Sequence, residues 1–126
     1  MSKLFTPVTF GPLTLRNRTI RSAAFESMCP GNAPSQMLLD YHRSVAAGGV
    51  GMTTVAYAAV TQSGLSFDRQ LWMRPEIIPG LKKLTDAVHA EGAAAHGKAH
   101  GRHQYRQPHA RHAGAAGAAG KPPGGP

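Results

Sequence analysis

The clearest hydrophobic pattern in the chain covers residues 50–60, which carry no charged side chain. Val50, Val55 and Val60 are spread along this stretch, and β-branched residues of this kind favour strands. A strand without polar alternation is typical of a parallel sheet with both faces covered. The pattern therefore predicts a buried strand with helices packed on both sides of it.

Helical patterns flank this strand on either side. Residues 35–47 repeat apolar side chains at helical spacing, with Ser35 in the position of an N-cap. The glycines at 48 and 49 follow directly and are expected to end this helix. Residues 79–91 form a second amphipathic pattern that ends at Gly92. Both stretches are therefore predicted to be helices.

Shorter apolar runs complete the pattern. Residues 4–10 and 13–15 enclose a Gly-Pro turn and predict a hairpin, and residues 17–25 predict a strand. Residues 93–95 are expected to begin a third strand after the second helix. A hairpin followed by alternating strands and helices is the opening of a (β/α) barrel or of a doubly wound sheet. Residues 61–75 are expected to form a surface connection.

Length and composition limit how much of such a fold the chain forms. The chain has 126 residues, whereas a closed (β/α)8 barrel needs roughly 250. Residues 96–126 contain no Leu, Ile, Val, Met, Phe or Trp, so they lack the material for a core. We therefore expect a folded part over residues 1–95 and a disordered tail over residues 96–126.

The tail also carries most of the charge. The formal net charge of the chain is +8, and residues 96–126 contain five basic residues and no acidic one. Residues 113–126 consist only of Ala, Gly, Lys and Pro, and the change of composition falls inside a predicted strand. We interpret the tail as an out-of-frame segment of a GC-rich gene. The alternative is an evolved basic tail of low complexity.

The tail has some candidate chemistry of its own. Five of the seven histidines lie in it, but no cysteine or carboxylate joins them, so no physiological metal site is predicted. Arg102, Arg106 and Arg111 with Tyr105 have the charge and the ring for contacts with RNA. A small basic module that binds nucleic acid or metal through the tail is therefore the alternative function, although a nucleic-acid partner is not favoured.

Other features indicate a cytoplasmic protein without a membrane segment. Cys29 is the single cysteine, so no internal disulfide is expected and a reducing compartment fits. The first ten residues lack a secretory signal, and no apolar run approaches the roughly 20 residues of a membrane span. The glycines of residues 48–51 end a helix and open a strand, which predicts a packing role rather than a dinucleotide loop.

Two side chains are well placed for chemistry in a parallel barrel, where functional groups gather at the carboxyl ends of the strands. Glu26 follows the first predicted strand, and Tyr57 lies inside the second. Each has a simpler interpretation: Glu26 as a solvated loop charge, and Tyr57 as a core residue with a satisfied hydroxyl.

Four stretches carry a more specific signal: LFTPVTFGPLTLRNR at 4–18, TIRSAAFESM at 19–28, LLDYHRSVAAGGVGMTTVAYAAV at 38–60 and IIPGLKKLTDAVHAEGAAA at 77–95. In order and spacing they resemble the old yellow enzyme family, the FMN-dependent NADH:flavin oxidoreductases and ene-reductases. The resemblance covers roughly the first three quarters of the chain. It implies an incomplete TIM (β/α)8 barrel: the N-terminal hairpin, two βα units and the start of a third strand.

The same resemblance implies a cofactor and a site. FMN is expected at the carboxyl ends of the strands, against Ala23, Ala24 and Phe25 on the first and Tyr57 on the second. Phe25 stands where relatives often have Thr or Cys, and Tyr57 where they have a smaller residue. The implied reaction takes hydride from NAD(P)H through the flavin to a small-molecule acceptor, an activated alkene or a related compound. HGKAHGR at 96–102 does not match the family, and later strands carry its acceptor ligands, so we expect an inactive fragment without catalytic residues.

Overall fold

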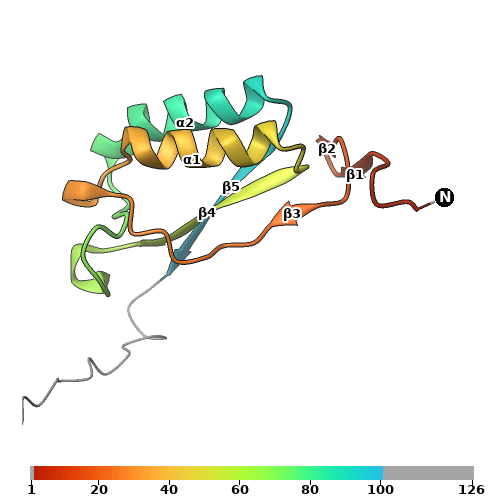
Figure 1. Ribbon diagram of the computed structural model, residues 1–126. Coiled ribbons are helices and arrows are strands. Elements are labelled where there is room, and N and C mark those ends of the chain that lie inside the picture. The colour runs from red at the N-terminus through yellow and green to blue at the C-terminus, as the bar shows by residue number, and fades with distance from the viewer. Residues whose placement is uncertain (1, 101–126) are drawn as a thin grey trace, which may run out of the picture.

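The chain begins with a small hairpin that extends away from the rest of the fold (Figure 1). The structure, a computed structural model, describes residues 2–100. The hairpin pairs β1 (Val8–Phe10) with β2 (Leu13–Leu15) in antiparallel register. Its turn includes Gly11, whose φ is +54°, a conformation that glycine adopts without strain. The predicted hairpin is confirmed, with β1 shorter than the expected stretch 4–10 and β2 as predicted.

A parallel sheet of three strands forms the centre of the fold. Its order is β3 (Ile20–Arg21), β4 (Met52–Ala59) and β5 (Ala94–His100). The helix α1 (Gln36–Ala47) connects the first two strands, and α2 (Ile78–Ala90) connects the second and third. The predicted alternation of strand and helix is therefore confirmed. Short 3-10 turns occur in the connections, at Pro30–Asn32, Gln62–Gly64 and Pro75–Ile77.

Both helices lie on one face of the sheet, side by side (Figure 1). The expectation of helices on both faces of the central strand is therefore wrong for the described residues. Successive right-handed strand–helix–strand connections place their helices on the same side. β4 is still largely buried: Thr54 and Ala56, which alternate with the helix-facing positions, are only 6% and 8% exposed.

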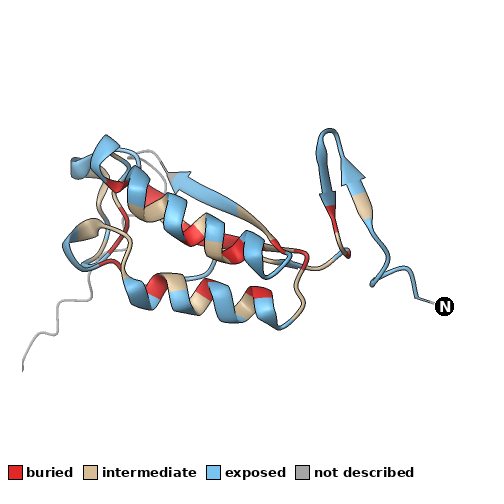
Figure 2. Cartoon of the chain, turned by 90° about the horizontal axis from the view of Figure 1, so that it is seen from above, coloured by how far each residue is buried: buried red, intermediate tan, exposed pale blue. Residues whose placement is uncertain are grey.

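The core lies between the two helices and β4. Leu38 and Ala46 of α1 meet Leu84 and Val88 of α2, and all four are at most 1% exposed. Figure 2 shows buried positions recurring along both helices. The hydrophobic cluster continues into the sheet through Val55, Ala58 and Ala93, and into the loops through Cys29, Leu71 and Ile77. Burial of these side chains is the main contribution to stability.

The helix boundaries agree with the sequence signals to within one residue. The Oγ atom of Ser35 accepts a hydrogen bond from the backbone N–H of Leu38 at 3.0 Å, which is the N-cap contact predicted for this position. Gly48 is the C-cap of α1, and Gly49 follows with a φ of +103°. Pro79 lies in the first turn of α2, where its missing N–H has no intrahelical partner in any case.

Two strands of the sheet, β3 and β5, differ most from their predicted extent. β3 has two residues instead of the expected stretch 17–25, because the chain leaves the sheet after Arg21. β5 continues to His100, so residues 96–100 belong to a strand and not to the expected tail. A parallel ladder is made by backbone groups, so a run of Ala, Gly, His and Lys extends it without large apolar side chains. The rest of the expected disordered tail, residues 101–126, lies outside the described residues.

Candidate functional site

A buried carboxylate joins three elements just beyond the end of β3. The side chain of Glu26 is only 5% exposed. Its Oε1 accepts a hydrogen bond from Nη1 of Arg21 at 2.7 Å and lies 2.8 Å from Nε2 of His42 on α1. Its Oε2 accepts from the backbone N–H of Ala56 on β4 at 3.0 Å. The interpretation of Glu26 as a solvated loop charge is therefore wrong.

The partners of this carboxylate are themselves held in place. Nη1 of Arg21 also donates to the carbonyl oxygen of Thr54 at 2.7 Å, and Nη2 donates to the hydroxyl of Tyr41 at 3.1 Å. The guanidinium group of Arg21 lies 4.9 Å from the centre of the Tyr41 ring, a cation–π contact. Nδ1 of His42 lies 2.7 Å from Oγ1 of Thr53 on β4. A continuous polar network therefore runs from β3 through α1 to β4.

The network determines the charge of the carboxyl group. Burial by itself raises the pKa of Glu26, but the contacts with His42, with the Ala56 N–H and with Arg21 outweigh burial and hold the pKa below its ordinary value. Glu26 is therefore ionised at neutral pH. Burial, followed by the nearby Glu26 charge, raises the pKa of the Cys29 thiol to about 11. The thiol therefore stays protonated and is a poor nucleophile.

An aromatic cluster, consisting of Phe25, Tyr57 and Phe67, lies at the same end of the sheet. The ring centres of Phe25 and Phe67 are 4.5 Å apart, with the rings tilted by 48°. Those of Tyr57 and Phe67 are 5.6 Å apart in an edge-to-face arrangement. Phe25 is nevertheless 65% exposed, so the cluster presents an aromatic surface to its surroundings.

A β-bulge decides the direction in which Tyr57 points. Val55 is paired with Gly97 and Ala58 with Ala99, so β4 has one more residue than β5 in this interval. Val55 and Ala58 both belong to the hydrophobic cluster formed with the helices. The extra residue thus reverses the alternation, and Tyr57 is directed away from the helices toward Phe67.

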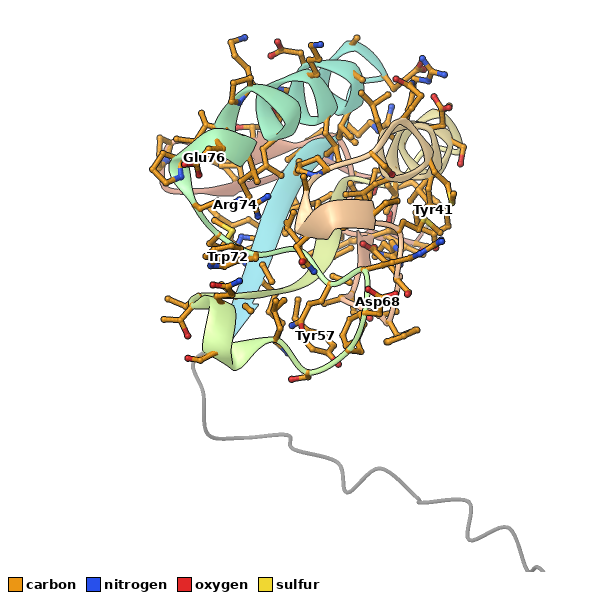
Figure 3. All side chains as sticks on the ribbon, turned by 90° about the vertical axis from the view of Figure 1, so that its left-hand side faces the viewer. Tyr41, Tyr57, Asp68, Trp72, Arg74 and Glu76 are labelled. Atoms are coloured by element: carbon orange, nitrogen blue, oxygen red, sulfur yellow. The ribbon has the colours of Figure 1, made fainter. Side chains whose placement is uncertain are left out.

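The two loops at this end of the sheet are bound to one another. The backbone N–H of Trp72 donates to the carbonyl oxygen of Asn32 at 3.2 Å, and Nη1 of Arg74 donates to the same oxygen at 2.8 Å. The guanidinium group of Arg74 also lies 4.7 Å from the centre of the Trp72 ring; Figure 3 labels both residues. Leu71 is 4% exposed. The connection over residues 61–75 is therefore anchored to the loop after β3 by Leu71, Trp72 and Arg74.

The structure brings together only part of the predicted site. Phe25 and Tyr57 both contact Phe67, whereas Ala23 is half-buried and Ala24 is exposed in the segment after β3. Sequence reasoning missed Phe67, which lies in an aperiodic loop and carries no local signal. It also missed His42, whose contacts with Glu26 and Thr53 form only when α1 packs on β4.

Metal and membrane sites are not found among residues 2–100. No three His, Cys, Asp or Glu side chains in this part of the chain are close enough to hold a metal ion. None of the helices described is long and apolar enough to cross a membrane. His103, His109, His112 and the basic residues around Tyr105, which formed the alternative binding site, lie outside the described residues.

Comparisons with known proteins agree with this geometry. The chain is 51% identical over 92 residues to the 4,4'-dithiodibutanoate disulfide reductase of Rhodococcus erythropolis, covering 73% of this chain and 23% of that protein. The solved structure of a 2-naphthoyl-CoA reductase complex matches with a TM-score of 0.73 and 28% identity, over 77% of this chain and 15% of that one. The old yellow enzyme homologue of Zymomonas mobilis shares the fold, with a TM-score of 0.69 at 19% identity over 78% of this chain and 28% of that one.

A model of one protein family matches most of the chain. It matches residues 3–115, beyond the boundary at residue 95 that the sequence pattern predicted. The described residues form the opening strands and helices of a TIM barrel and no closed barrel, so the predicted incomplete barrel is confirmed. The chain spans about a quarter of the length of the disulfide reductase, 23%. It belongs to the NADH:flavin oxidoreductase / NADH oxidase family, as its resemblance to the old yellow enzymes indicated.

Proposed function

We propose that this chain forms the N-terminal part of the flavin site of an FMN-dependent oxidoreductase. The observation that carries the proposal is the aromatic cluster at the carboxyl ends of the strands, with Phe25 exposed, in a chain that belongs to a flavin oxidoreductase family. Phe25 and Tyr57 supply flat surfaces for a ring system, and the small side chains of Ala23 and Ala24 leave space beside them. The residues present therefore fit one side of a flavin ring.

The residues that the structure describes contribute to the proposed reaction mainly by packing against the flavin. When FMN is bound, it carries hydride from NAD(P)H to a small-molecule acceptor, an activated alkene or a related compound. Phe25 and Tyr57 would pack against the ring and exclude water from it. Glu26 is not available as a general base, because both of its oxygens already have partners inside the protein. None of the residues 2–100 is assigned a proton-transfer role, and we propose that the chain alone does not turn over NAD(P)H.

The ring site predicts an effect for one substitution. Phe25→Ala should raise the dissociation constant of lumiflavin, measured by quenching of its fluorescence, by about tenfold. The reason is that the flavin ring loses a stacking partner. Phe10→Ala is the matched control, since Phe10 is 57% exposed on the hairpin and lies outside the aromatic cluster. Equal binding by both variants would contradict the ring site. Stoichiometric FMN with NADPH turnover by the unaltered chain would contradict its inactivity.

We further propose that the intact protein is cytoplasmic, because its single cysteine, Cys29, fits a reducing compartment.

We also propose that the tail is out of frame. The composition changes after residue 95, although both β5 and the family match continue beyond it. Sequencing the gene is expected to reveal a one- or two-base change near codon 95, with barrel-like sequence in another frame beyond it. If no frame encodes such a sequence, the basic segment is an evolved part of the chain.

A further inference from the structure

The end of β3 lacks the backbone partners that a strand would give to β4. The ladder between these strands contains only the pairs Ile20–Met52 and Arg21–Thr53. Beyond it, side chains contact the backbone of β4: Arg21 donates to the carbonyl oxygen of Thr54, and Glu26 accepts from the N–H of Ala56. Two side chains therefore take the place of the missing strand.

These contacts coincide with the bulge. Ala56 and Tyr57 are the two residues of β4 that lie between the paired positions Val55 and Ala58. A bulge disturbs the local ladder and leaves backbone groups in need of other partners. The carboxylate of Glu26 satisfies the N–H of Ala56, the residue immediately before Tyr57. The direction of Tyr57 thus depends on a backbone segment that Glu26 holds.

The carboxylate is well suited to this role. Arg21 reaches it from β3 and His42 from α1, and Tyr41 of α1 contacts the same arginine. Cys29, in the segment after β3, is protonated and contributes no charge. Glu26 therefore faces two potentially cationic groups and no second carboxylate among these neighbours, so its negative charge is retained in a buried position.

We propose that Glu26 is a positioning residue, whose carboxylate holds the β4 bulge and thereby directs Tyr57 toward the flavin end of the sheet. This inference rests on the proposed function for the identity of the ligand, but the geometry of the carboxylate and the bulge does not. It assigns to Glu26 an indirect role, exerted through the backbone of Ala56 and the ring of Tyr57.

The test uses the full chain labelled with 3-fluorotyrosine, whose ¹⁹F resonances are assigned with Tyr41→Phe and Tyr57→Phe. Glu26→Gln keeps the shape of the side chain but removes its charge. At neutral pH we expect this variant to shift the Tyr57 resonance while the helical circular dichroism is unchanged. Asp40→Asn is the control, because Asp40 is an exposed carboxylate paired with Arg43 at 2.8 Å. An unshifted Tyr57 resonance in Glu26→Gln would overturn the proposal.

An acid titration of the unaltered chain and of Glu26→Gln provides a second measurement. Because the folded-state pKa of Glu26 is lowered, its contribution is complete above its ordinary pKa of about 4.3 and is lost as the pH falls through the lowered value. The Tyr57 resonance of the unaltered chain should move in that acidic range, before the helical signal disappears. If Tyr57 changes only together with the helices, or if Glu26→Gln keeps this transition, the proposal is wrong.

Lumiflavin quenching separates this inference from the proposed function. We expect Glu26→Gln to raise the dissociation constant of lumiflavin by about tenfold, the same effect as the loss of one ring contact. If the Tyr57 resonance shifts in Glu26→Gln but the unaltered chain does not quench lumiflavin, the role of Glu26 at the bulge holds and the proposed function fails. If the unaltered chain quenches lumiflavin and the variant changes neither signal, the proposed function holds and this inference fails.

Discussion

Replacing Arg16 by methionine is expected to lower the free energy of unfolding by about 4 kcal/mol, since hydrogen bonds to charged groups contribute about 1.5–3 kcal/mol each. The guanidinium group of Arg16 donates to the carbonyl oxygens of Ala46 at 2.5 Å, Val50 at 2.9 Å and Glu91 at 2.7 Å. These oxygens lie at the end of α1, before β4 and after the end of α2. A cation at the carboxyl ends of helices also interacts favourably with their dipoles. One side chain therefore joins both helices to the sheet.

The control for this prediction is Arg18→Met, two residues along the chain. Arg18 is exposed, and its Nε donates to Oγ1 of Thr6 at a long 3.4 Å. Its loss should change the unfolding free energy by no more than about 0.5 kcal/mol, as for most surface substitutions. Urea denaturation of both variants of the full chain gives the comparison. Similar midpoints for the two variants would show that the carbonyl contacts of Arg16 contribute little.

Gly51→Ala is expected to destabilise the fold by about 3 kcal/mol, as is typical of overpacking in a site that cannot relax. A Cβ atom at Gly51 would lie 2.6 Å from the carbonyl oxygen of Asn17 and 3.0 Å from that of Thr19. Both are backbone atoms, and the oxygen of Thr19 accepts hydrogen bonds from the N–H groups of Gly51 and Met52. The methyl group would therefore separate β4 from the segment that leads into β3.

Gly97→Ala is the matched substitution in the neighbouring strand. A Cβ atom at Gly97 would meet nothing within 4 Å among the described residues. The change should be neutral or should stabilise the chain by up to about 1 kcal/mol, because alanine restricts the unfolded backbone more than glycine does. Thermal unfolding of the two variants side by side tests the prediction. A smaller loss for Gly51→Ala than for Gly97→Ala would contradict the packing role of Gly51.

The helices and the order of elements could be read from local signals. Ser35 at the start of α1, Gly48 at its end and Pro79 in the first turn of α2 act through neighbouring backbone groups, so their effect does not depend on the rest of the fold. The four motif stretches likewise indicated the family before any geometry was known. The run at residues 50–60 indicated a buried strand, because it lacks the charged side chains that are typical of a solvated surface.

The candidate site was only partly accessible to such reasoning. Phe25 and Tyr57 were proposed from the resemblance, but nothing local shows that Phe67, in a distant loop, lies between them. The partners of Glu26 come from β3, α1 and β4, so their convergence depends on how these elements pack. The direction of Tyr57 depends on a bulge defined by pairing with β5, which cannot be seen in β4 alone.

The sequence by itself determined the strand–helix alternation, the helix ends and the family, because periodicity, capping and motif spacing are properties of neighbouring residues. Only the tertiary structure decided that β3 ends at Arg21, that β5 reaches His100 and that Glu26 is buried as an ionised group. These features depend on which backbone groups find partners in other elements. A strand ends or continues, and a carboxylate turns inward, according to the hydrogen bonds that distant segments provide.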